Sequence, residues 1–111
     1  MAEPTLVEIF GAGATQTATT ITIQKASLTG LTPSATNSAE SLFAGIVKQA
    51  ATTLTDANFA ANSDQSITLV PSFESIIQRT VGGVLTGYLQ SQFNIGFNKL
   101  QSTTGITPDS Y

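Results

Sequence analysis

The sequence predicts an α+β fold, with a mainly antiparallel β-sheet, one amphipathic helix and an extended N-terminal arm. Two runs of alternating apolar residues, within residues 15–25 and 93–98, are typical of half-buried strands. Between them, residues 42–54 carry apolar side chains at helical spacing. The order strand, strand, helix and then further strands favours an antiparallel sheet covered by one helix. At 111 residues the chain fits a single domain, residues 1–111.

The N-terminal third indicates extended structure. Residues 4–10 predict a short strand or an extended arm, and Gly11 to Ala14 a flexible turn, so residues 1–14 are interpreted as a flexible arm. The stretch Thr15 to Lys25 is rich in β-branched residues and predicts a half-buried strand. Residues 30–34, GLTPS, end that strand.

One clear helix follows. Asn37 is a candidate N-cap and Glu40, three residues later, completes a capping box. The apolar stripe of this helix consists of Leu42, Phe43, Ile46, Val47, Ala50 and Leu54. We expect the helix to end near residues 53–55 and Phe59 to fill the core from a connecting loop.

The second half of the chain contains further strands. Residues 65–70 predict a strand that Pro71 ends, whereas residues 72–80 fit either a strand or a helical turn. Pliable glycines at 82, 83 and 87 follow.

The strongest strand prediction is residues 93–98. Phe93, Ile95 and Phe97 share one face, which we interpret as core, with an exposed adhesive edge as the alternative. Residues 101–111 are polar and predict a loosely held tail.

Composition narrows the classes of function. Charged residues make up 10% of the chain, far below the roughly 25% of an average globular protein, and neutral polar surface costs less to cover than charged surface. This low charge favours packing against other proteins. The net charge is −3 and the four basic residues are scattered, which argues against nucleic-acid binding. The sequence contains no apolar run long enough for a membrane span and does not begin with a signal-peptide pattern, so no membrane partner is predicted.

No catalytic residue, metal site or cofactor is predicted. The chain has no histidine and no cysteine, which removes the commonest general base and the thiolate ligands. The stretch FGAGATQT, residues 10–17, has the first two glycines of a dinucleotide-binding loop. Gln16 stands where the third small residue belongs, and strand formers follow instead of a helix, so this stretch predicts a turn.

Two further groups of residues fit ordinary surface roles better than catalytic ones. A hairpin across Pro71 would bring Asp64 near Glu74, but an ion pair between Glu74 and Arg79 is the simpler expectation. Lys25 and Ser27 would share one strand face, which is typical of solvated residues rather than of a Ser–Lys catalytic pair.

Assembly through the N-terminal region is the favoured mode of interaction. Residues 5–24 carry few of the charges that protect a strand edge, so they could pair with a neighbouring subunit. The candidate subunit-contact arm comprises Thr5, Leu6, Val7, Ile9, Phe10, Thr19, Ile21 and Ile23.

Three stretches carry a resemblance to a known class of proteins: NFAANSDQSITLVPSF (58–73), QFNIGFNKL (92–100) and TGITPDSY (104–111). They resemble small proteins encoded by tailed bacteriophages and by cyanobacterial genomes with phage-like genes. The resemblance implies a non-enzymatic virion protein, made in the host cytoplasm. It would be a capsid decoration (cement) protein or, alternatively, a neck, tail or baseplate component. Its implied partners are other virion proteins and further copies of itself.

A carbohydrate- or cell-surface-binding module is the rival from another class, because neutral polar sheets serve that role. Sugar stacking needs exposed aromatic rings, and the chain has no tryptophan and only Tyr88 and Tyr111 as tyrosines.

Overall fold

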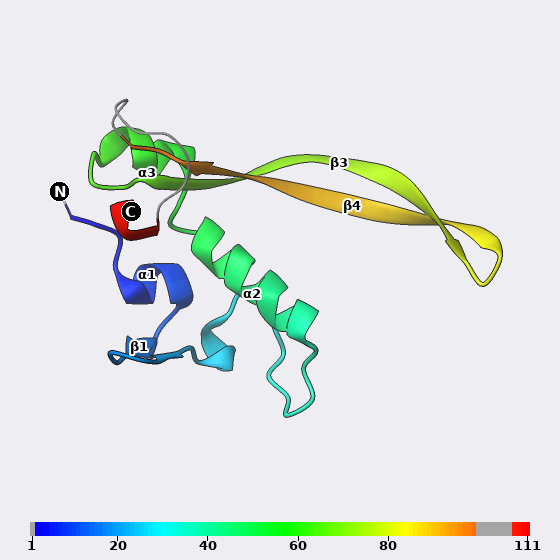
Figure 1. Ribbon diagram of the computed structural model, residues 1–111, viewed down its shortest axis with the longest axis horizontal. Coiled ribbons are helices and arrows are strands. Elements are labelled where there is room, and N and C mark those ends of the chain that lie inside the picture. The colour runs from blue at the N-terminus through cyan, green and yellow to red at the C-terminus, as the bar shows by residue number, and fades with distance from the viewer. Residues whose placement is uncertain (1, 100–107) are drawn as a thin grey trace.

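The computed structural model describes residues 2–99 and 108–111 and confirms the α+β class (Figure 1). A body of helices and a small two-stranded sheet carries a long antiparallel hairpin that projects to one side. The radius of gyration is 16.9 Å, whereas a compact domain of this length is expected near 13 Å. The helices are α1 (Leu6–Phe10), α2 (Ala39–Ala51) and α3 (Asp56–Ala61), with 3₁₀ turns η1 (Lys25–Ser27) and η2 (Pro108–Ser110). The strands are β1 (Thr15–Gln16), β2 (Ile21–Thr22), β3 (Ile67–Val81) and β4 (Val84–Phe97).

Residues 6–10 form the helix α1 instead of the predicted strand or extended arm. Thr5 is its N-cap: the hydroxyl accepts a hydrogen bond from the Glu8 amide at 3.1 Å, and the Glu8 carboxylate accepts one from the Thr5 amide at 2.9 Å. This reciprocal capping box satisfies two donors that a helix start leaves free. It stabilises a helical turn in a segment whose apolar residues also suit a strand.

The strand predicted over residues 15–25 is reduced to a small hairpin of β1 and β2, which a four-residue turn connects. Within that turn the Thr17 hydroxyl accepts hydrogen bonds from the amides of Thr19 and Thr20. Threonine side chains that bond to nearby backbone amides favour turns over a continuous ladder. Residues 25–27 then form η1, so Lys25 and Ser27 do not share a strand face.

Helix α2 starts one residue later than predicted. Its N-cap is Ser38, whose hydroxyl accepts from the Ser41 amide at 3.1 Å, while the Asn37 side chain bonds to the preceding loop. The stripe buries Ala50, but Phe43 is 68% exposed. The reason is visible in Figure 1, where the N-terminal end of α2 points away from the hairpin. The helix ends at Ala51, two residues before the predicted end, and the predicted core residue Phe59 lies in α3 and is 36% exposed.

The core lies where α2 meets the base of the hairpin. Ala50, Leu54 and Leu69 are buried together there. Ile9, Val47, Ala51, Ile67 and Phe93 pack around them. The Leu69 amide also donates to the Leu54 carbonyl at 2.7 Å, so backbone and side chains both attach β3 to the chain that follows α2.

The strands β3 and β4 form one continuous hairpin. Pro71 does not end β3, because the register shifts by a β-bulge between Pro71 and Glu74, and a bulge tolerates a missing amide donor. Residues 72–80, which the sequence left open, are therefore strand. Gly82 and Gly83 form the turn with φ of 57° and 80°, which matches the two-residue type I′ turn.

The predicted core face of the last strand is only partly buried. Phe93 packs against the core, but Ile95 and Phe97 are 53% and 43% exposed. The ring of Tyr111 meets that of Phe97 edge-on at 5.5 Å, so the chain end contacts the base of the hairpin. Residues 101–107 of the predicted tail lie outside the described part of the chain.

Candidate functional site

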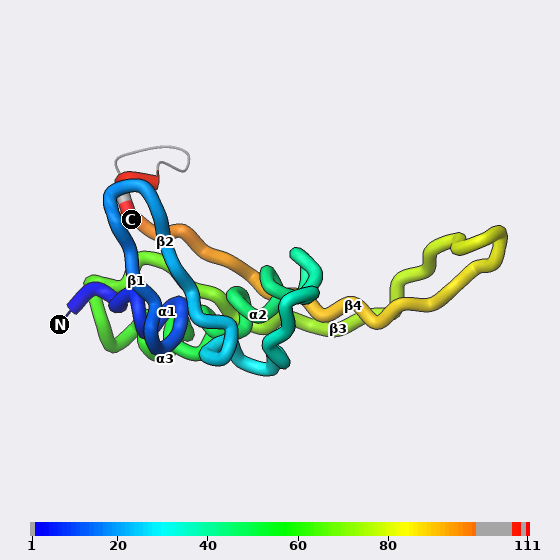
Figure 2. Tube along the Cα trace, turned by 90° about the horizontal axis from the view of Figure 1, so that it is seen from below, coloured from blue at the N-terminus to red at the C-terminus, as the bar shows by residue number. Residues whose placement is uncertain are grey.

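The most distinctive surface is the outer hairpin, defined here as residues 74–91. Its strands run for eight residues on each side of the turn, about 27 Å at the usual rise per residue. Figure 2, turned by 90° from Figure 1, shows the same projection beyond the helices. An isolated two-stranded hairpin is at best marginally stable in water, so its side chains are the place to look for a partner surface.

One face of the outer hairpin carries three aliphatic side chains among polar ones, which include Glu74 and Gln78. Ile76 lies opposite Leu89, and Leu85 lies opposite Thr80 on the same face. Ile76, Leu85 and Leu89, which we name the aliphatic face, are 66%, 65% and 65% exposed. Surfaces of this kind on a projecting element are typical of contact sites with another molecule.

The opposite face is mixed. Ile77 lies opposite Tyr88, and Val81 opposite Val84. The Arg79 guanidinium lies 5.1 Å from the centre of the Tyr88 ring, a cation–π distance, so this cation covers part of the aromatic surface. Val84 next to the turn is 64% exposed. Both faces of the outer hairpin thus present apolar side chains.

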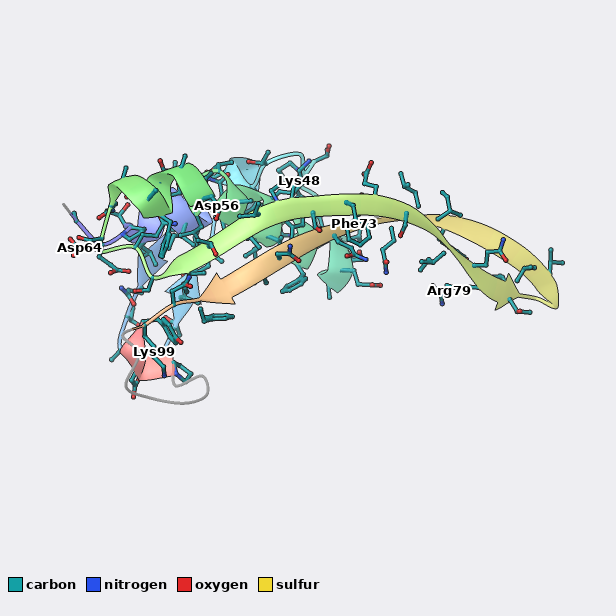
Figure 3. The ribbon with its side chains drawn as sticks, turned by 90° about the horizontal axis from the view of Figure 1, so that it is seen from above. Lys48, Asp56, Asp64, Phe73, Arg79 and Lys99 are labelled. Carbon is teal, nitrogen blue, oxygen red and sulfur yellow. The ribbon has the colours of Figure 1, made fainter. Side chains whose placement is uncertain are left out.

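The carboxylates singled out from the sequence do not meet. Because β3 is continuous through Pro71, Asp64 stays at the body end of the strand, well away from Glu74. Figure 3 labels Asp64 and Arg79 at opposite ends of the molecule. Glu74 and Arg79 lie on opposite faces, and each has another partner: the Ser91 hydroxyl donates to the Glu74 carboxylate at 2.6 Å.

The predicted contact arm is divided between half-buried and exposed residues. In α1, Leu6, Ile9 and Phe10 are half-buried, and Ile9 packs against the core. Val7 and Ile21 are 47% and 50% exposed and are the apolar members that remain accessible. Thr5 caps α1, Thr19 lies in the turn between β1 and β2, and Ile23 follows β2 and is half-buried.

The glycines of the FGAGATQT stretch serve backbone geometry. Gly11 ends α1 with φ of 98°, and Gly13 has φ of 81°. The chain continues from them into β1, so no helix N-terminus faces this loop. The turn predicted here is confirmed.

In the part of the chain that the structure describes, one cleft brings charged and polar side chains together. A cleft of about 530 Å³ lies between α2 and the base of the hairpin, lined by Lys48, Pro71, Ser72, Glu74, Ser91, Gln92 and Phe93. Within residues 2–99 and 108–111, no three acidic side chains gather as metal ligands would. None of the helices described in those ranges is long and apolar enough to cross a membrane.

Comparison with known proteins gives no relative: no protein-family model, curated protein or solved structure matches the chain. Sequence reasoning missed the outer hairpin, although one signal marked it. Gly82 and Gly83 stand between two valines and two apolar runs, which is the pattern of a two-residue hairpin turn.

Proposed function

We propose that this chain is a non-enzymatic structural subunit that attaches to neighbouring proteins through its outer hairpin. The observation that carries the proposal is the aliphatic face, where Ile76, Leu85 and Leu89 are about two-thirds exposed on an element that projects from the body. Burying the rest of each side chain would contribute about 1–2 kcal/mol.

A comparison of the free energy of burial with the cost of association favours contact with both faces of the hairpin. Three aliphatic side chains supply about 3–6 kcal/mol, whereas association costs an estimated 4–15 kcal/mol in lost freedom of motion. Covering Ile77, Val81, Val84 and Tyr88 on the other face would roughly double the apolar contribution. A hairpin inserted between neighbouring subunits therefore suits these residues better than one laid on a flat surface.

The setting we propose is a virion, and the capsid decoration role is preferred. Support for the setting is the resemblance of residues 58–73, 92–100 and 104–111 to small phage proteins. A cement protein acts by burying surface across neighbouring shell subunits, which is what a projecting apolar hairpin suits. A neck, tail or baseplate position would use the same surface.

The carbohydrate-binding alternative is less well supported by the aromatic residues. Arg79 lies over the Tyr88 ring, and the Tyr111 ring has Phe97 at its edge and the Lys99 ammonium 5.6 Å from its centre. Both tyrosines are thus engaged by neighbouring side chains. A glycan array with competable binding would favour this alternative.

The test is co-purification with particles. Virions produced by the source cells are banded on a density gradient and probed with an antibody to the chain. We expect the chain to band with the particles in a fixed ratio to the shell protein. Recovery of the chain only in the soluble fractions would contradict the virion assignment.

Variants identify the surface that attaches. Ile76→Ser with Leu89→Ser removes two residues of the aliphatic face and should release the chain from particles. Phe43→Ser is the matched control, because Phe43 is equally exposed but lies on α2. Val7→Ser with Ile21→Ser tests the predicted N-terminal arm in the same way. If only Val7→Ser with Ile21→Ser released the chain from particles, the attaching surface would be the N-terminal arm and not the outer hairpin.

A further inference from the structure

We propose that the free edge of β4 pairs with the β4 edge of a second copy of this chain, antiparallel about a two-fold axis at Gly87. The inference deepens the proposed function, since it names one partner of the outer hairpin. In the described part of the chain, β3 and β4 pair only with each other, so the outer edge of β4 has no strand beside it.

The two edges of the hairpin differ in how well they are protected against pairing. The β3 strand carries Pro71, a bulge, Glu74 and Arg79, all of which discourage a further strand. Residues 84–92 of β4, VLTGYLQSQ, contain neither a charge nor a proline, and the bulge leaves β4 without an extra residue. An edge of this kind is a template for strand addition.

Symmetry restricts the register. Opposed residues in an antiparallel pair point to the same face of the sheet. A two-fold axis normal to the sheet keeps each residue on its own face, so the two copies of one residue must lie opposite each other across the axis. With Gly87 on the axis, Leu85 of one copy lies opposite Leu89 of the other. An axis at residue 86 would oppose Leu85 to a glycine, and an axis at residue 88 would oppose it to Ser91. An axis at residue 85 or 89 would oppose one leucine to its own copy and form a single leucine pair, whereas the Gly87 register forms two leucine pairs and is therefore preferred.

The backbone is oriented for this pairing. In a two-residue hairpin the residues next to the turn, Val81 and Val84, are a hydrogen-bonded pair, and the direction of the amides alternates along each strand. The amides of Leu85, Gly87 and Leu89 consequently point away from β3. Two copies would exchange about six backbone hydrogen bonds across the axis.

The pairing widens the aliphatic face. In the resulting four-stranded sheet, one row of side chains would run across the strands in the order Ile76 and Leu89 of one copy, then Leu85 and Thr80 of the other. Glu74 and Arg79 are the charges of the outer hairpin and sum to zero, so two copies do not repel one another there. The contact is small by the standard of stable dimers, so we expect association in the micromolar range.

Substitution of Gly87 gives the first test. Gly87→Pro removes the amide that points outward, whereas Gly87→Ala keeps it and adds a Cβ that meets only Ile76 Cγ2 at an ordinary 3.5 Å. Light scattering across a concentration series should show dimers for the unmodified chain and for Gly87→Ala. Gly87→Pro should raise the dimer dissociation constant by about tenfold or more. Equal association of the two variants would overturn the proposal.

Disulfide trapping gives the second test, because the natural chain has no cysteine. Gly87→Cys places two sulfurs next to the axis, at a Cα separation of about 5.5 Å that a disulfide accepts. Ser91→Cys is the control, since in this register the two copies of residue 91 lie about 27 Å apart. We expect rapid covalent dimers for Gly87→Cys only. Absence of this cross-link, or equal cross-linking at residue 91, would contradict the register.

The outcomes separate this inference from the proposed function. The chain could stay monomeric and fail to cross-link, while Ile76→Ser with Leu89→Ser still releases it from particles. That result would contradict the pairing of two copies and support the structural role. A chain that dimerises through Gly87 but never bands with particles supports the pairing and contradicts the virion role.

Discussion

Ile76 and Leu89 lie directly opposite each other in adjacent strands, and about two-thirds of each side chain is exposed. Cross-strand aliphatic pairs normally pack on a core. This pair lies on the outer hairpin, beyond the cluster that buries Leu54 and Leu69. The apolar side chains therefore fall into two groups. One forms a small core that stabilises the body, and the other forms a projecting surface that is available for contact with another molecule.

The first prediction is that the exposed pair contributes little to folding. Ile76→Ser with Leu89→Ser should change the free energy of unfolding by less than about 1 kcal/mol, because the side chains are already largely hydrated. Chemical denaturation followed by circular dichroism measures this change. A loss of several kcal/mol would mean that the pair is part of the fold, and the particle-release experiment would then need single substitutions.

The second prediction concerns the core. Leu54→Ala should cost about 2–4 kcal/mol, because Leu54 is 6% exposed and its removal leaves a cavity between α2 and β3. The same denaturation experiment gives the value. Leu85→Ala is a matched control, since it deletes the same atoms from a leucine that is 65% exposed. Similar losses for both variants would contradict the division between core and projecting surface.

The helical stripe was the most predictable part of the fold. Spacing alone placed Ala50 and Leu54 in the core, and both are buried. The same spacing placed Phe43 there, but a stripe shows which residues share a face and not how far the neighbouring element extends. The N-terminal end of α2 points away from the hairpin, and Phe43 is 68% exposed.

Short segments were less predictable because two local forces compete in them. Residues 6–10 have the side chains of a strand, yet the Thr5–Glu8 capping box stabilises a helix. Pro71 predicts the end of a strand, yet a bulge accommodates it. The outer hairpin was not predicted as a site because its apolar residues resemble core residues in sequence. Their exposure depends on the absence of a covering layer, which is a tertiary property.

The third prediction concerns Gln65, a buried polar residue with 3% exposure. Its amide donates to the carbonyls of Thr55 at 3.2 Å and Ile67 at 2.9 Å, and so connects the start of α3 to β3. Gln65→Leu should cost about 1–3 kcal/mol, because both carbonyls lose their side-chain donor. Asn58→Leu is the comparison, since its amide also donates to a carbonyl, that of Thr53, but from an exposed side chain. A smaller loss at Gln65 than at Asn58 would contradict this role.

The fourth prediction separates two costs of replacing a glycine. Gly11 has φ of 98°, and an added Cβ would lie 2.8 Å from Ser27 Cβ and 2.9 Å from the Ser27 carbonyl oxygen. Ser27 is itself held by a 2.7 Å hydrogen bond from its hydroxyl to the Ala12 carbonyl, which limits its freedom to move away. Gly11→Ala therefore incurs both backbone strain and a steric clash.

Gly30→Ala is the matched control, because Gly30 has φ of 79° but its added Cβ would meet only the flexible Lys48 Nζ at 3.6 Å. Backbone strain alone should cost about 1–2 kcal/mol at Gly30. The clash, together with the ψ of 165° that places Gly11 in a backbone region open essentially to glycine, should raise the cost at Gly11 by at least about 1 kcal/mol more. Denaturation of both variants under the same conditions measures the two changes in the free energy of unfolding. Equal losses would show that the loop after α1 can shift away from Ser27, and the close packing of these two segments would then not constrain the fold.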